Sequence, residues 1–175
     1  MNTQRSKKRA RAFGFPPTSL PDPAGDNKTY RLISDLATKL RLSSKITDRR
    51  TAGKELLSLL SNVKTKKKLL IESSSDNPRE LGAVYRMVVT NALYASETIL
   101  QKKSTKLMAD DVTLPYKLMR HCEGQGSSVF SRKDVLALLN YCLNMLNHDP
   151  AKEAAETDLL EMLSFLCSNA DYVVS

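Results

Sequence analysis

The chain has 175 residues, of which 41% are hydrophobic, and its formal net charge is +8 at pH 7. This length and apolar content suffice for one folded domain, and the lack of alternating strand patterns argues against a β architecture, so the sequence predicts an all-α fold. No apolar run approaches the roughly 20 residues that cross a bilayer, and no apolar segment follows the basic N-terminus, so we expect neither a membrane span nor a secretory signal. Three cysteines without a close pair are typical of reduced thiols in an intracellular protein.

Residues 1–28 form a basic, proline-rich segment that we expect to be a disordered tail. Within it, the cluster of Lys7, Lys8, Arg9 and Arg11 has the density of a nuclear import signal, and an import receptor could reach it in such a tail. A solvated basic tail with weak, nonspecific affinity for phosphate explains the same cluster equally well. On the first interpretation the protein is nuclear.

From residue 29 to residue 175, apolar residues recur at three- and four-residue steps, which predicts six or seven helices joined by short turns. The expected helices span 30–42 and 44–63, a short segment ending near 71, 78–100, a helix capped by Asp110 or Asp111, 131–146, and one from 149 onward. The expected caps are Ser43 or Ser44 for the second helix, and Ser131 with Asp134 as a capping box. Antiparallel helix pairs of about 40 residues are typical of HEAT-like α-solenoids, and we expect the stack to continue beyond Ser175.

Charged residues interrupt the apolar stripe of the second predicted helix. Arg50 lies on the line that faces a neighbouring helix, and Lys45 and Arg49 flank that line. Asp48 follows Lys45 by three residues, so it can take part in an ion pair. Burying an unpaired guanidinium is costly and a paired one adds little stability, so this cluster indicates recognition more than stability. A solvated first helical turn is the alternative interpretation.

The order of these residues resembles the short TAN motif (telomere-length maintenance and DNA damage repair) near the N-terminus of ataxia-telangiectasia mutated (ATM) type kinases, which belong to the phosphatidylinositol 3-kinase-related family. The motif consists of a leucine, a basic residue, an acidic residue three places later, an arginine and spaced leucines. Its counterparts here are Leu42, Lys45, Asp48, Arg49, Leu56 and Leu60. Gly53 stands where the family usually has leucine, so we expect looser packing at this turn. The resemblance extends in the same order over roughly residues 35–148.

The resemblance implies a helical TAN-type domain over 29–175 that serves as the docking and regulatory region of a serine/threonine kinase. The implied roles are DNA damage response, DNA repair and telomere length maintenance, with a protein partner that recruits the kinase to DNA ends or telomeres. We expect no catalysis from this segment, because it has no glycine-rich phosphate loop and no catalytic Asp and Asn pair. His121, Cys122 and His148 fit no zinc spacing, so no metal and no cofactor are expected either.

A second basic cluster, Lys64, Lys66, Lys67 and Lys68, supports a different hypothesis. On that hypothesis the chain is a free-standing helical adaptor that binds nucleic acid or chromatin through phosphate contacts. We expect these lysines at a helix C-terminus, where they complement the helix dipole first and contact DNA only second. The basicity of the chain is concentrated in this cluster and in the N-terminal one, so any DNA contact is expected to be weak and local.

Overall fold

The computed structural model describes residues 28–72, 78–102, 105–122 and 130–168, and every regular element within these ranges is an α-helix. The helices are α2 (Lys28–Leu42), α3 (Ile46–Ser61), α4 (Val63–Glu72), α5 (Pro78–Leu100), α6 (Ala109–Cys122), α7 (Arg132–Leu146) and α8 (Asp149–Ser168). The prediction of an all-α fold is confirmed. The expected tail lies outside the described residues, except for Lys28, which begins α2.

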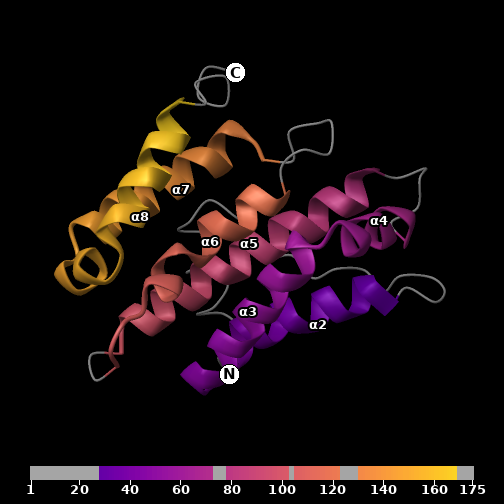
Figure 1. Ribbon diagram of the computed structural model, residues 1–175, viewed down its shortest axis with the longest axis horizontal. Coiled ribbons are helices and arrows are strands. Elements are labelled where there is room, and N and C mark those ends of the chain that lie inside the picture. Colours follow the sequence, from indigo (N-terminus) through magenta and orange to yellow (C-terminus); the bar gives the residue numbers. More distant parts are fainter. Residues whose placement is uncertain (1–27, 73–77, 103–104, 123–129, 169–175) are drawn as a thin grey trace.

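The helices pack as three consecutive pairs, which Figure 1 shows side by side in chain order. The pairs are α2 with α3, α5 with α6, and α7 with α8, and α4 lies against both α2 and α3. Between pairs, α2 contacts α5, while α3 contacts α6 and α6 contacts α8. The start of α3 is therefore placed between the end of α2 and the start of α6.

One continuous apolar core runs through all the pairs. The apolar stripe predicted for the first helix is buried, with Ile33, Leu36 and Leu40 at most 4% exposed. Two tyrosines, Tyr85 and Tyr141, are among the largest fully buried side chains. Burial of this much apolar surface is the main driving force for folding of such a bundle.

The starts of α5 and α8 and the capping box of α7 agree with the sequence pattern, whereas the starts of α3, α4 and α6 depart from it. The capping box of α7 is present, because Ser131 Oγ accepts from Asp134 N at 3.3 Å and Asp134 Oδ2 accepts from Ser131 N at 2.8 Å. The cap of α3 is Lys45, without a side-chain bond, since Ser43 N still donates to Lys39 O in the last turn of α2. The expectation of a serine cap there is wrong.

At the start of α6, Asp111 reaches back instead of acting as the cap itself. Its Oδ2 accepts from Met108 N at 2.9 Å, so the residue occupies the acidic position of a half-formed capping box. Between α3 and α4, Asn62 ends one helix and starts the next, because its Oδ1 accepts from Lys64 N at 2.9 Å. The helix expected over 44–63 therefore ends at Ser61, and the lysine cluster lies within α4.

The two buried tyrosines differ in the partners of their hydroxyl groups. Tyr141 donates to Val112 O at 2.7 Å. The Tyr85 hydroxyl is buried and has no hydrogen-bond partner within the described structure. Burial, with a smaller contribution from Cys122, raises the pKa of Tyr85 to about 12.

We expect Tyr141→Phe to lower the free energy of unfolding by about 1–2 kcal/mol, because it leaves a buried carbonyl without this donor. Tyr85→Phe removes only a hydroxyl that was already unsatisfied, so the free energy of unfolding should stay the same or rise slightly. Urea denaturation followed by circular dichroism measures both. Equal losses in the two variants would contradict the different bonding of the two hydroxyls.

Candidate docking site at the α2–α3 corner

Arg49 ties the end of α2 to the start of α3. Its side chain crosses the corner, where Nε donates to Ser43 O at 2.7 Å and Nη1 donates to Leu40 O at 3.2 Å. The last carbonyls of a helix have no partner within the helix and carry its negative dipole end, so a guanidinium is a favourable donor for them. Arg49 is only 7% exposed, which makes it the most deeply buried cation of the predicted motif.

The aromatic ring of Tyr94 supports this buried cation. The Arg49 guanidinium lies 6.0 Å from the ring centroid, and that of Arg41 lies 5.3 Å from the same centroid. Burial lowers the pKa of Arg49, while the electrostatic effect of Tyr94 opposes that shift. The corner is thus held by two charge-assisted hydrogen bonds and a ring contact from α5.

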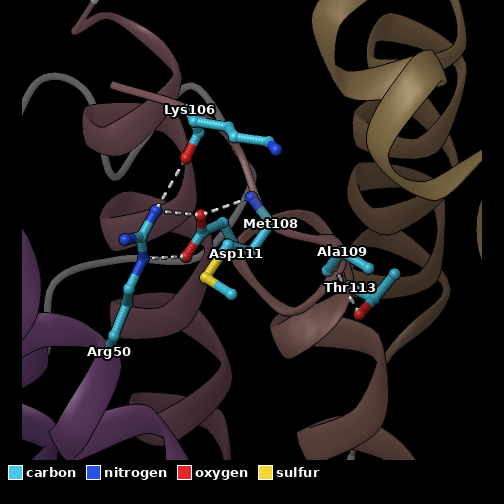
Figure 2. A network of polar contacts seen from close by, with 6 residues as sticks. All are labelled: Arg50, Lys106, Met108, Ala109, Asp111 and Thr113. Atoms are coloured by element: carbon cyan, nitrogen blue, oxygen red, sulfur yellow. Dashed lines mark hydrogen bonds and ion pairs between the residues drawn. The ribbon is translucent and has the colours of Figure 1, made fainter. Parts of the chain in front are cut away.

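Arg50 joins α3 to the start of α6 through Asp111. Figure 2 shows the two-pronged pair, in which Arg50 Nε donates to Oδ1 at 2.9 Å and Nη2 donates to Oδ2 at 2.7 Å. Nη2 also donates to Lys106 O at 3.0 Å. The hydrogen bonds that Arg50 donates to Asp111 raise the pKa of Arg50. The Asp111 side chain is 2% exposed and that of Arg50 is 25% exposed, so the pair is largely buried.

Three residues of the motif lie on the surface. Lys45 and Asp48 are both exposed, and neither makes an ion pair with any described residue. Leu42 is 66% exposed. Of the charges near the predicted helix seam, Arg49 and Arg50 lie between helices as expected, whereas Lys45 and Asp48 point to the surface. Leu42 is too exposed to hold any of them in place. The physical reason is that Leu42, the last residue of α2, follows the buried Leu40 by two residues and therefore lies on the opposite side of the helix.

The other leucines of the motif anchor α3. Leu56 and Leu60 are both fully buried. Gly53, between the charges and the leucines, is buried as well, and a Cβ atom built on it would lie 2.7 Å from Leu114 Cδ2. The expectation of looser packing at this turn is therefore wrong, because the missing side chain lets α6 approach α3 closely. A small cavity of about 70 Å³ lies beside this contact, and Arg49, Arg50 and Leu114 help to line it.

The second basic cluster lies on α4. Lys64, Lys67 and Lys68 are exposed and Lys66 is half-buried. Since α4 begins at Val63, these lysines occupy its first two turns, and the expectation of a helix C-terminus is wrong. The import-signal candidates Lys7, Lys8, Arg9 and Arg11 lie outside the described residues.

The histidines and cysteines considered for chemistry have packing or capping contacts. His148 Nδ1 accepts from Ala151 N at 3.2 Å at the start of α8. Burial, followed by Lys66 and Arg120, lowers the pKa of His121. Among the described residues, no group of three or more His, Cys, Asp or Glu is placed to hold a metal ion. No helix in the described ranges has the length and apolar character that crossing a membrane requires.

Sequence reasoning missed two arginine–aspartate pairs. Asp111 was expected only as a cap, and the pair of Arg86 with Asp134 was not expected at all. In both cases an aspartate in the first turn of a helix was the available signal, because such a residue is placed to accept from the helix start. Its arginine partner lies 61 or 48 residues earlier in the chain, which no local pattern indicates.

Comparison of the chain with protein-family models, with characterised proteins and with solved structures gives no match. The resemblance to the TAN motif therefore stays a prediction that rests on the order of residues.

We expect Asp111→Ala to lower the free energy of unfolding by about 2–3 kcal/mol, because it leaves Arg50 and Met108 N without their acceptor. The partial exposure of Arg50 keeps the loss below that of a fully buried pair. Asp110→Ala is the matched control, because its 60% exposed side chain forms only a surface pair with Lys117. The control should change stability by less than about 0.5 kcal/mol. Similar losses in the two urea titrations would contradict the role given to Asp111.

We expect Gly53→Leu to show a coupling of at least about 1 kcal/mol with Leu114→Ala in a double-mutant cycle, because the larger side chain needs the space that Leu114 fills. The gain in helix propensity on replacing glycine is the same in both backgrounds and cancels in the cycle. Thermal and urea unfolding of the four proteins give the coupling. Additive effects would show that α3 and α6 are not in close contact at Gly53.

Proposed function

We propose that this chain is the N-terminal docking and regulatory region of an ATM-type serine/threonine kinase that acts in the nucleus in DNA damage response, DNA repair and telomere maintenance. On this proposal the segment carries out no catalysis. It holds a protein partner that brings the kinase to DNA ends or telomeres. The support is the ordered match of residues from Leu42 to Leu60, together with the positions that those residues take in the fold.

The observation that carries the proposal is that some motif residues are buried and hold α3 in place, while others are exposed on the surface. Arg49 is buried and fixes the corner through two backbone carbonyls, and Leu56 and Leu60 fix the rest of α3 in the core. Lys45 and Asp48 are exposed on the first turn that this support holds in place. Charges of both signs at defined positions on a rigid element favour recognition of one partner over others.

The packing of the helices is consistent with the proposed family. Consecutive pairs lie side by side, and the second helices of the pairs, α3, α6 and α8, contact one another in chain order. Stacked helix pairs of this kind form extended surfaces to which partners bind. The corner belongs to the first pair, α2 with α3, which forms one end of the described stack.

The test exchanges the two exposed charges, because Arg49 is too deeply buried for a charge reversal to leave the fold unchanged. Lys45→Glu with Asp48→Lys preserves the net charge and changes no buried contact. Cells of the source organism that carry this variant in place of the chromosomal copy should show progressive telomere shortening and loss of recruitment to DNA breaks. Telomere length over successive generations and imaging of the tagged protein at induced breaks measure these effects.

The matched control exchanges the charges of the exposed pair on α8, Lys152→Glu with Glu156→Lys, whose side chains lie 3.8 Å apart. This control should keep normal telomeres, and both variants should be as abundant as the original protein. Normal telomeres and normal recruitment in the corner variant would overturn the docking proposal. A transcript whose reading frame ends without kinase catalytic motifs downstream would overturn the assignment to an ATM-type kinase.

A further inference from the structure

The four lysines of α4 lie outside the proposed docking site at the α2–α3 corner. Three of them form one surface. Lys64, Lys67 and Lys68 are separated by three and four residues, so their side chains leave the same side of the helix, and all three are exposed. We call these three residues the lysine face. Leu69 is fully buried on the opposite side, which fixes the direction in which the lysine face points.

The acidic residue of α4 does not neutralise the lysine face. Glu72 follows Lys68 by four residues, the spacing of a helix ion pair. Its carboxylate instead binds the start of α2, accepting from Thr29 N at 3.2 Å and from Tyr30 N at 2.8 Å. None of the three lysines forms an ion pair with any residue that the structure describes. The positive charge of this face therefore stays available to a ligand.

The basic character continues past the lysine face in two directions. Residues 28–72 hold twelve lysines and arginines against four acidic residues. On the other side of α4, Lys66 acts electrostatically on His121 at the end of α6, as does Arg120. The open groove of about 410 Å³ beside Arg120 carries both signs of charge, because Lys117, Asp158 and Glu161 also line it. The densest run of exposed lysines in the described residues therefore lies on α4.

We propose that the lysine face of α4 binds the phosphate backbone of nucleic acid without sequence preference. Lysine ammonium groups on long side chains contact phosphates as point charges, and three of them on adjacent positions of one helix can neutralise several neighbouring phosphates. Val63 and Ile71, which are 65% and 78% exposed on the same helix, would also suit an acidic amphipathic peptide. Four lysines among the five residues from Lys64 to Lys68 favour the polyanion.

The experiment measures binding of the full chain to a short fluorescein-labelled DNA duplex by fluorescence anisotropy, at salt concentrations from about 50 to 200 mM. The variant Lys64→Gln, Lys67→Gln, Lys68→Gln should reduce the slope of log affinity against log salt by about three, and lower the affinity at the lowest salt by at least about tenfold. The control replaces three exposed lysines outside residues 28–72, with Lys106→Gln, Lys133→Gln and Lys152→Gln. It should keep the original slope.

Each result decides the question. The basic residues near the N-terminus are the same in all three proteins, so an unchanged slope in the α4 variant would place binding elsewhere and overturn the proposal. No binding of the original chain at the lowest salt would also overturn it. Capture of a labelled polyglutamate peptide in place of the duplex would identify α4 as a protein-docking surface instead. Circular dichroism melts of the variants check that the fold is intact. Telomere length in the corner variant tests the proposed docking function independently of this result.

Discussion

The structure depends on carboxylates that hold helix starts to distant parts of the chain. Asp111 and Asp134 each accept from a backbone N–H three residues before them, and each also pairs with an arginine of an earlier helix pair. Glu72, at the end of α4, binds the start of α2 by accepting from Thr29 N and Tyr30 N. Apolar burial supplies most of the stability, but it is tolerant of small shifts between helices. These buried acceptors are directional, so they fix where each helix begins relative to its neighbour.

Local patterns in the sequence were sufficient for the helices, the core stripes and the capping box of α7, because each of these depends on residues within one or two turns. These patterns did not predict the start of α4, because the lysine cluster was assigned to the end of the preceding helix. The signal was Asn62, whose side chain can cap a helix, although its neighbour Val63 also extended the preceding apolar stripe. The pair of Arg50 with Asp111 was out of reach, since it depends on how α3 and α6 meet across 61 residues.

At the candidate site, too, the sequence pattern could not predict contacts that depend on how the helices meet. A helical projection placed Arg50 toward a neighbouring helix and Arg49 beside it, whereas Arg49 is the more buried of the two. The projection assumes that a neighbouring helix packs along the whole length of α3. The chain instead turns sharply between α2 and α3, and the carbonyls of Leu40 and Ser43 at that turn attract the side chain that faces back along the chain. The packing of Gly53 was misjudged for a related reason, because its close neighbour, Leu114, lies on another helix pair.

The two charged surfaces at either end of α3 suit different kinds of ligand. The corner presents one cation and one anion, and a partner must match both signs in position, which gives selectivity. The lysine face presents a single sign, which any polyanion can satisfy and which salt weakens. α3 has 16 residues, and at a rise of about 1.5 Å per residue its two ends lie about 24 Å apart. This separation exceeds the Debye length of about 8 Å at physiological salt, so the charges of the two surfaces are largely screened from one another. On the two proposals, the protein partner and the nucleic acid would therefore contact separate surfaces of the fold.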